Sequence, residues 1–404
     1  MISDLSAEII IIGKEILNGF RRDCNVESIA RWLLKNGFSL DKVQIIGDID
    51  KDIAEALKLT KARLIFVTGG IGTTRDDRTR FVIADAFKRK LRLSKESVVC
   101  LSEKLRKRNV FFTNRYRELC KFPESALRLD NPRGLAEAFI LPVKSRAFIV
   151  LPGVPFEIES ILALPSFNEN IRHFFSTKKC EGHILGLVGL RESEIEDICL
   201  DIPEFQRGKV SLLPSPGLVY LILQNKKLLP LLKKRFGNYI FTYSGENLEQ
   251  VVIELLKRQN KTCSVAESCT GGMLGEVLTS VSGASQVFNG GLIVYQNEIK
   301  IKELGVSSNT LKNFGAVSKI TAKEMACCVR KKMKSDWGIA ITGIAGPSGG
   351  SKEKPVGTVF IAVSGNKQNT VIKNIFSGDR NIVRISAVRF ALNLLRRMIL
   401  ETVK

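Results

Sequence analysis

The sequence predicts an α/β protein made of more than one domain. Apolar runs with the length of buried strands alternate with segments of helical spacing, and several of the runs end in glycine-rich turns. This alternation is typical of parallel sheets that helices cover on both faces. The 404 residues also exceed the length of one ordinary domain. We therefore expect three units along the chain, at residues 1–172, 178–245 and 247–404.

Residues 1–172 are expected to form an α/β domain with a ligand site at one edge of its sheet. Strand and helix patterns alternate at residues 7–12, 25–36, 43–46, 53–59, 63–67 and 147–151. The strand at 63–67 runs into a glycine-rich turn that contains Asp76 and Asp77. Ligands of such sheets bind beyond the carboxyl ends of the strands. The two carboxylates could hold a divalent cation that bridges phosphates, or could only stabilise the dipole of a following helix.

Residues 178–245 have the pattern of a small α+β module. Strand-like runs and helical patterns are found at residues 184–188, 192–199, 218–222 and 228–235. The Pro214-Ser215-Pro216-Gly217 stretch indicates a turn between them. No residue of this module suggests chemistry, so a spacer or a dimerisation role is the simplest interpretation.

Residues 247–404 contain the strongest functional pattern. Strands are expected at 262–265, 290–295, 338–342 and 355–363, and helices at 248–258, 273–278 and 382–399. The turn at 266–272 joins a strand to a helix and contains Ser268, Thr270, Gly271 and Gly272. Free N–H groups at a helix N-terminus can bind an anion, and glycines let a phosphate approach the backbone. Taken alone, the turn favours the simpler interpretation, in which Ser268 or Thr270 only caps the helix.

The composition excludes several classes of protein. The two histidines, His173 and His183, lie outside the glycine-rich turns, which disfavours a Ser-His-Asp triad or a histidine-bound zinc. No run approaches the ~18 apolar residues of a membrane span, and no signal peptide is apparent. We expect a cytoplasmic protein whose nine cysteines are reduced. The net charge of +21 suits a phosphorylated substrate, and no specific nucleic-acid-binding signature is present.

Five motifs in the last unit resemble, in order and spacing, those of the CinA C-terminal domain. They lie at residues 266–272, 294–300, 315–318, 341–351 and 355–358. The resemblance implies a nicotinamide-nucleotide amidase of pyridine nucleotide salvage and NAD metabolism. Such a hydrolase converts the carboxamide of nicotinamide mononucleotide to nicotinate mononucleotide and ammonia. No metal or cofactor is implied for this reaction, and by analogy we expect a homodimer.

Amide hydrolysis requires a nucleophile, a base, and hydrogen-bond donors for the oxyanion. The resemblance implies that Ser268 is the nucleophile and that Lys300 and Tyr295 accept and relay its proton. A lysine can do so only if its pKa is lowered by burial or by neighbouring cations. Without the resemblance, Lys300 would be taken for a surface lysine of a helix.

The resemblance also implies a set of substrate-binding residues. Thr342 would contact the substrate and Arg380 would pair with its phosphate. Thr270, Gly271 and Gly272 would offer backbone N–H groups, either to the phosphate or to the oxyanion. The alternative for Thr342 is a strand-end hydroxyl that caps a loop, and for Arg380 an exposed arginine at a helix start.

Residues 1–172 resemble the molybdopterin-binding-like N-terminal domain of CinA, and residues 187–201 with 214–217 resemble its small middle domain. Some members carry a metal-dependent ADP-ribose pyrophosphatase in the first domain, where Asp76 and Asp77 would hold the metal. This sequence has Lys14 and Arg133 where the family has Thr and Val, which puts bulk and charge there. Two alternatives to the amidase stay open. One is the pyrophosphatase, and the other is a non-enzymatic scaffold linked to competence.

Overall fold

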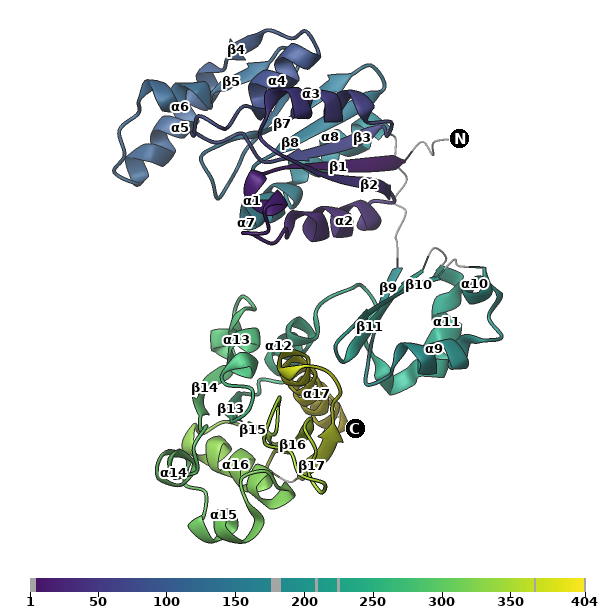
Figure 1. Ribbon diagram of the computed structural model, residues 1–404, viewed down its shortest axis with the longest axis vertical. Helices are drawn as coiled ribbons and strands as arrows, with labels where there is room; N and C mark the ends of the chain where they lie inside the picture. Colours follow the sequence, from purple (N-terminus) through teal and green to yellow (C-terminus); the bar gives the residue numbers. More distant parts are fainter. Residues whose placement is uncertain (1–4, 176–182, 208–209, 224–225, 367, 403–404) are drawn as a thin grey trace. The chain divides into compact units, whose positions relative to one another are not determined.

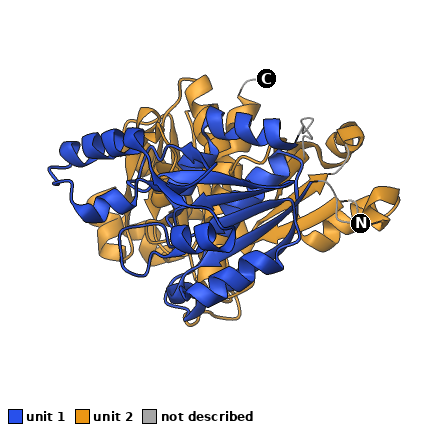
Figure 2. Cartoon of the chain, turned by 90° about the horizontal axis from the view of Figure 1, so that it is seen from above, with its two compact units in different colours: residues 1–182 blue, residues 183–404 orange. Residues whose placement is uncertain are grey.

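The computed structural model describes residues 5–175, 183–207, 210–223, 226–366 and 368–402. The chain divides into two compact units, residues 1–182 and 183–404, which Figure 2 colours separately. The first unit has a six-stranded and a two-stranded sheet, and the second has a four-stranded and a five-stranded sheet. The first residues of the module predicted at 178–245 lie outside the described residues. The exact limits of the three predicted domains stay predictions.

The large sheet of the first unit has the order β2-β1-β3-β8-β7-β6. Its strands are β1 (Ser6–Ile12), β2 (Ser39–Ile46), β3 (Leu64–Thr68), β6 (Leu127–Leu129), β7 (Ala138–Val143) and β8 (Arg146–Leu151). The four strands β2, β1, β3 and β8 are parallel, as predicted. β7 runs antiparallel to β8, because only Lys144 and Ser145 connect the two strands and so short a turn allows no crossover.

Helices cover both faces of this sheet (Figure 1). The elements are α1 (Lys14–Leu17), α2 (Asn25–Lys35), α3 (Asp50–Leu59), α4 (Thr79–Ala86), β4 (Leu91–Leu93), α5 (Lys95–Lys107), α6 (Asn114–Glu118), β5 (Lys121–Pro123), α7 (Pro155–Leu162) and α8 (Pro165–Phe175). One core cluster joins the sheet to α2, α7 and α8, and another joins it to α3, α4 and α5. The unit is therefore the expected three-layer α/β/α domain. Every residue of β1 and β3 is buried, as expected for strands covered on both faces.

The second unit begins with a small antiparallel sheet of order β10-β11-β9-β12. Its elements are β9 (His183–Val188), α9 (Glu192–Cys199), α10 (Pro203–Gln206), β10 (Val210–Ser215), β11 (Leu218–Leu223), η1 (Lys226–Leu228), α11 (Leu229–Phe236), η2 (Gly237–Tyr239) and β12 (Ile240–Thr242). The predicted turn is shorter than the 214–217 stretch, because Pro214 and Ser215 pair with β11. Only Pro216 and Gly217 form the hairpin loop, and Gly217 supplies the positive φ of 77°.

The last sheet has the order β14-β13-β15-β16-β17. Its elements are α12 (Leu248–Arg258), β13 (Cys263–Glu267), α13 (Met273–Thr279), η3 (Ala284–Gln286), β14 (Phe288–Ile293), α14 (Asn297–Ile299), the π-helical segment η4 (Lys300–Leu304), α15 (Ser308–Phe314), α16 (Lys319–Lys332), β15 (Trp337–Gly343), β16 (Thr358–Ser364), β17 (Asn369–Ile375) and α17 (Arg380–Glu401). β14, β13 and β15 are parallel, while β16 and β17 are antiparallel. The edge strand β17 was not predicted, because its polar residues obscure the apolar pattern.

Alternate residues of these strands face two different helical layers. Val265, Ile339 and Ile361 share a core with α12 and α17, whereas Ala266 and Ala340 share one with α16. The small residues on the second face let α16 approach β15 closely. A Cβ placed on Gly338 would lie 2.1 Å from the carbonyl oxygen of Ala326 in α16. Because β13, β14 and β15 are parallel, their carboxyl ends lie at one edge of the sheet, as expected.

Helix α17 also ties the small sheet to the last one. Arg389 donates to the hydroxyl of Ser215 and to the carbonyl of Pro216, both at 2.7 Å. Arg396 donates to the carbonyls of Asn238 and Ile240 at 2.8 and 3.0 Å. Within the residues described, no helix is long and apolar enough to cross a membrane.

Candidate active site

Ser268 is the first residue after β13, at the edge where the parallel strands end. Its N–H donates to the carbonyl of Ile341 on β15 at 3.0 Å, which fixes the chain as it leaves the sheet. The turn that follows requires two positive φ angles, 60° at Gly271 and 96° at Gly272. Glycine adopts these angles without steric cost, so the Gly-Gly pair lets α13 start at Met273, directly after the turn. The side chain of Ser268 is buried apart from about a tenth of its surface.

Lys300 reaches Ser268 from the segment that follows β14. Its Nζ lies 3.2 Å from the Ser268 Oγ, 2.8 Å from the carbonyl oxygen of Val294 and 3.0 Å from that of Tyr295. The residue is fully buried and begins the π-helical segment η4, a type of helix that is frequent at functional sites. The alternative of a solvated surface lysine is therefore wrong for this structure.

The surroundings of Lys300 lower its pKa. Burial shifts the pKa below its ordinary value of 10.5, and the nearby Cys269 opposes this shift. Within the described residues, no carboxylate forms an ion pair with Lys300. The protonated amine donates to the Ser268 hydroxyl and to the two carbonyls. After the loss of one proton, its two remaining N–H groups suffice for the carbonyls, and its lone pair can face the Ser268 hydroxyl. This arrangement is suited to removing the proton of that hydroxyl.

Glu267 supports the turn from beneath. Its buried carboxylate accepts from the N–H groups of Gly272, Leu274 and Gly275, at 3.1, 3.0 and 2.8 Å. These are N–H groups of the first turn of α13, which lack partners inside the helix. A carboxylate at a helix N-terminus also matches the helix dipole. Glu267 therefore orders the backbone that carries Ser268.

The backbone donors predicted in the turn are used unequally. The N–H of Gly271 donates to the carbonyl of Ser268 at 3.1 Å, and that of Gly272 to Glu267. The N–H groups of Cys269 and Thr270 donate to no described residue, so they are the ones that could serve an oxyanion. The Thr270 hydroxyl is buried and lacks a partner within the described residues, which leaves it available to a bound ligand or water.

Arg380 and Tyr295 lie together. Arg380 begins α17 and donates to the Tyr295 hydroxyl at 3.2 Å and to the carbonyl of Gly346 at 2.7 Å. A guanidinium has five N–H donors, so three stay available to an anion. The contact of Tyr295 with Lys300 is made by its main chain, while its hydroxyl points to Arg380. Thr342 is fully buried, and its hydroxyl donates to the carbonyl of Ala316 at 2.8 Å.

Arg384 is a site residue that the sequence reasoning missed. Its Nε and Nη2 both donate to the carbonyl of Thr270, at 3.3 and 2.7 Å. It lies four residues after Arg380, so the two arginines share one face of α17. That spacing was the signal that could have identified it.

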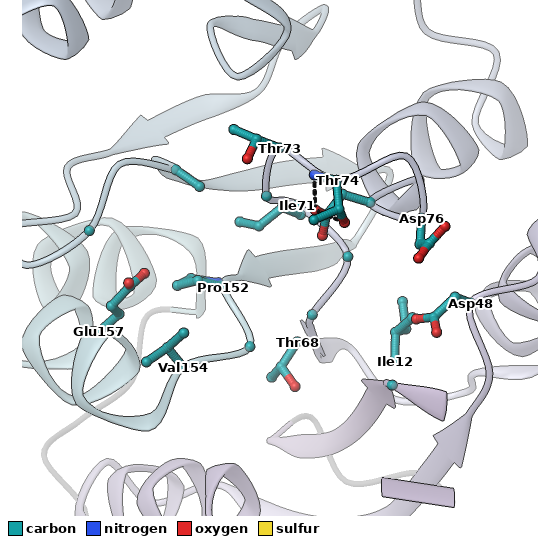
Figure 3. A pocket seen from close by; sticks show the side chains of 18 of the residues that line it. Ile12, Asp48, Thr68, Ile71, Thr73, Thr74, Asp76, Pro152, Val154 and Glu157 are labelled. Carbon is teal, nitrogen blue, oxygen red and sulfur yellow. Dashed lines mark hydrogen bonds between the residues drawn. The ribbon is translucent and has the colours of Figure 1, made fainter. Parts of the chain in front are cut away.

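A cavity of about 500 Å³ lies in the first unit, at the carboxyl ends of β1, β3 and β8. The side chains of Asp48, Asp76 and Glu157 line it, and Figure 3 shows Glu157 on the opposite side of Thr68 from the two aspartates. Arg21 and Arg108 line it as well, which suits a phosphorylated ligand. Lys14 and Arg133, the departures from the family pattern, are outside its lining.

Asp76 and Asp77 are not arranged as a metal site in this structure. Asp77 accepts from the N–H and the hydroxyl of Thr74, both at 2.6 Å, while Asp76 is exposed. Among the residues described, the one group of three metal-ligand atoms within 4.8 Å is that of Cys100, Asp130 and Glu137. The residues predicted to hold a metal therefore do not fit one as they lie here.

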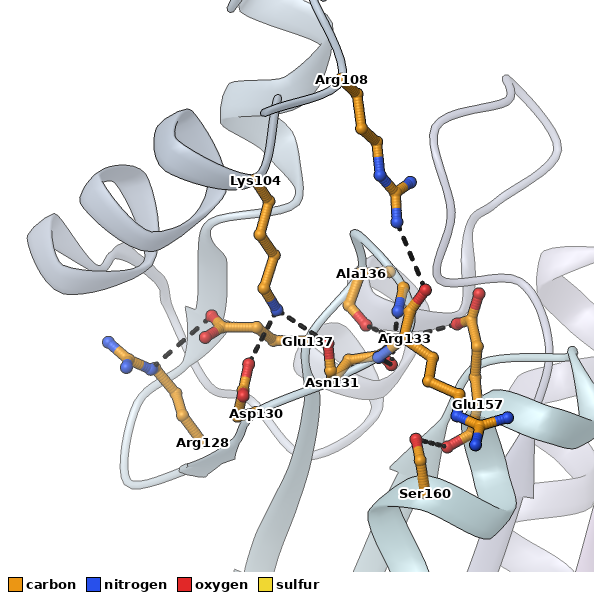
Figure 4. A network of polar contacts seen from close by, with 11 residues as sticks. Lys104, Arg108, Arg128, Asp130, Asn131, Arg133, Ala136, Glu137, Glu157 and Ser160 are labelled. Atoms are coloured by element: carbon orange, nitrogen blue, oxygen red, sulfur yellow. Dashed lines mark hydrogen bonds and ion pairs between the residues drawn. The ribbon is translucent and has the colours of Figure 1, made fainter. Parts of the chain in front are cut away.

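One carboxylate of the Cys100 group already pairs with a lysine side chain. Lys104 Nζ bonds Asp130 at 2.8 Å and the carbonyl of Asn131 at 2.7 Å (Figure 4). Asn131 in turn donates to Glu157 at 2.7 Å. These hydrogen bonds hold the loop beside the cavity.

Comparison with known proteins identifies the family of the chain. Residues 245–399 match the model of the CinA C-terminal domain, and residues 8–166 match that of the "Probable molybdopterin binding domain". A CinA-like protein of Thermotoga neapolitana is 36% identical over 98% of this chain and 98% of its own length. The chain belongs to the CinA family. A CinA-like protein of Kosmotoga olearia is 34% identical, over 99% of this chain and 100% of its own.

One solved structure with similarity is that of the competence/damage inducible protein CihA from Agrobacterium tumefaciens. It is 37% identical, covers 37% of this chain and 93% of that chain, and has a TM-score of 0.37. One of the CinA motifs of this chain contacts the Ser268 turn directly, through Lys300. The motif at 294–300 supplies Tyr295 and Lys300, and the one at 315–318 supplies the acceptor of Thr342.

Removing the Glu267 carboxylate is expected to destabilise the C-terminal unit. Glu267→Ala leaves three N–H groups without their acceptor, and we expect a loss of about 2–3 kcal/mol in the free energy of unfolding. Urea denaturation of the full chain measures it. The matched control is Glu276→Ala, an exposed glutamate of α13 that should change stability by less than about 0.5 kcal/mol. Equal effects of the two substitutions would contradict the role assigned to Glu267.

Proposed function

We propose that residues 247–404 hydrolyse the carboxamide of nicotinamide mononucleotide to nicotinate mononucleotide and ammonia. The observation that carries the proposal is the buried Lys300 amine 3.2 Å from the Ser268 Oγ. A serine hydroxyl is a weak nucleophile until a base removes its proton. Here the described residues around the serine offer a lysine in that place, and its pKa is lowered. The CinA motifs of the chain supply the substrate class.

The reaction proceeds through an acyl-enzyme in this proposal. Ser268 Oγ attacks the carboxamide carbon while its proton passes to Lys300. The N–H groups of Cys269 and Thr270 stabilise the oxyanion. The tetrahedral intermediate collapses when Lys300 returns the proton to the leaving nitrogen, which departs as ammonia. Water then attacks the ester with Lys300 as the base, and the carboxylate product leaves with Ser268 restored.

Arg380 is assigned to the phosphate of the nucleotide. It is exposed and keeps three N–H donors after its bonds to Gly346 and Tyr295. A guanidinium pairs well with phosphate oxygens through parallel N–H bonds. The Tyr295 hydroxyl, held by Arg380, is placed to contact the bound nucleotide rather than to relay the serine proton.

The first experiment measures ammonia release from nicotinamide mononucleotide by the full chain, with and without a chelator. We expect release that the chelator does not change. Ser268→Ala should lower kcat by roughly 10³-fold or more, and Lys300→Ala by roughly 10²- to 10⁴-fold. The matched control is Lys302→Ala, an exposed lysine of the same segment, which should keep normal turnover. Substantial turnover by folded Ser268→Ala would refute the mechanism.

The pH dependence follows from the Lys300 amine. The base form of Lys300 is the active one, so kcat/KM rises as pH increases through the pKa of Lys300 and levels off above it. Because burial lowers that pKa, the midpoint of the rise should lie below 10.5. A pH–rate profile of the wild type measures the limb. A profile that falls over this range would show that the protonated lysine is required instead.

The two arginines of α17 should affect different kinetic constants. Arg384→Ala leaves the Thr270 carbonyl without its donor and shifts the turn at residues 268–272. We therefore expect kcat to fall about 10- to 100-fold with little change in KM. Arg380→Ala removes a phosphate contact and should raise KM roughly tenfold or more. Arg384→Lys keeps the charge without the fork and should recover part of kcat. A pure KM effect of Arg384→Ala would make it a substrate contact.

Metal-dependent hydrolysis of ADP-ribose stays the alternative function. The 500 Å³ cavity of the first unit favours a phosphorylated ligand there. The arrangement of Asp76 and Asp77 does not favour a metal, so no metal step is derived. Metal-dependent cleavage of ADP-ribose together with absent ammonia release would move the function to the first unit.

A further inference from the structure

Helix α17 connects two different regions of the second unit. Its first turns carry Arg380 and Arg384, which contact the candidate active site. Its later turns carry Arg389 and Arg396, which bind the small sheet module. A cavity of about 250 Å³ lies beside these later turns, between them and the small module. It is separate from the residues around Ser268.

The cavity has an apolar wall. Val188 of β9, Ile372 of β17, and Phe390 and Leu394 of α17 line it. Val188 and Leu394 are buried, and Ile372 and Phe390 are partly buried against the same core. An apolar cavity of this size can hold the body of a single-ring or short branched molecule.

The polar groups of the cavity are donors. The Oδ1 of Asn393 accepts from Arg396 at 2.9 and 3.1 Å, so its amide nitrogen stays available to donate. Arg397 lines the cavity, is exposed, and makes no hydrogen bond or ion pair with any part of the chain that is described. Tyr239 also lines the cavity.

The charge beside the cavity is positive, and no carboxylate of the described residues forms an ion pair with it. Arg396 is buried, and its acceptors are neutral oxygens of Asn238, Ile240 and Asn393. Burial lowers the pKa of Arg396 to about 10, and the neighbouring Arg397 adds to this shift. A buried charge is normally paired with an opposite charge. An anion at Arg397 would supply that charge.

We propose that this cavity binds a small organic carboxylate. Its carboxylate pairs with the free guanidinium of Arg397 and accepts from the Asn393 amide, while its apolar body packs against Phe390 and Leu394. The apolar wall and the single free guanidinium favour a monocarboxylate over inorganic phosphate, whose charge and hydration they cannot match. The proposal goes beyond the amidase and does not depend on it. The bound molecule would contact both the small module and α17.

The test uses the full chain with benzoate, benzamide and inorganic phosphate as probes. Titration followed by NMR or calorimetry should show saturable benzoate binding with a Kd of roughly 1 mM, as expected for so small a ligand. Benzamide has the same shape without the charge, and it should bind about tenfold more weakly or not at all, as should phosphate.

The variants locate the site. Arg397→Ala should weaken benzoate binding by about tenfold or more, and Arg397→Lys by less. Lys373→Ala is the matched control, because Lys373 follows Ile372 on β17 and points to the other face of the strand. Lys373→Ala and Ser268→Ala should bind benzoate normally. Circular dichroism verifies that each variant is folded.

Four results would overturn the proposal. One is the absence of saturable benzoate binding, and another is benzoate binding that is unchanged in folded Arg397→Ala. The third is benzamide or phosphate binding as tight as that of benzoate, which would show a site of different chemistry. The fourth is loss of benzoate binding in Ser268→Ala, which would place the ligand in the active site. Ammonia release is measured separately and does not depend on the first three results, so the two proposals fail independently.

Discussion

The burial of Lys300 is the constraint on which the chemistry of the C-terminal unit depends. An ammonium group loses much of its hydration when it is buried, so the neutral amine becomes more favourable there. Two main-chain carbonyls at the end of β14 satisfy its N–H groups, and the Ser268 hydroxyl faces the remaining position. The fold therefore lowers the pKa of Lys300, which is what the proposed role of a base requires.

The turn that carries Ser268, at residues 268–272, is held from two sides. Beneath it, Glu267 accepts three N–H groups of the turn and the first turn of α13. Opposite, Arg384 binds the carbonyl of Thr270. The positive φ angles of Gly271 and Gly272 make the turn tight, and these charged contacts keep it in one conformation. Such preorganisation is what an oxyanion site requires, because its donors must already point at the developing charge.

Helix α17 gives the second unit its continuity. Arginines along it bind the active-site loops at one end and the small sheet module at the other. The helix therefore contacts both the Ser268 turn and the small module. The sequence suggested a spacer or a dimerisation role for that module, and in the structure it lines one side of the cavity at Arg397.

The sequence alone determined the alternation of strands and helices, the three-layer character of the first unit, and the membership of the CinA family. It did so because periodicity reports which residues face a core, and because Ser268, Lys300 and Tyr295 stand in motifs of fixed spacing. The antiparallel strands β7 and β17 were not foreseen, since pairing direction depends on partners distant in the chain. Arg384 was missed because it reaches Thr270 across 114 residues. Only the tertiary structure decided that Lys300 is buried against Ser268 and that Asp77 binds Thr74, because these side chains meet only when separate elements pack together.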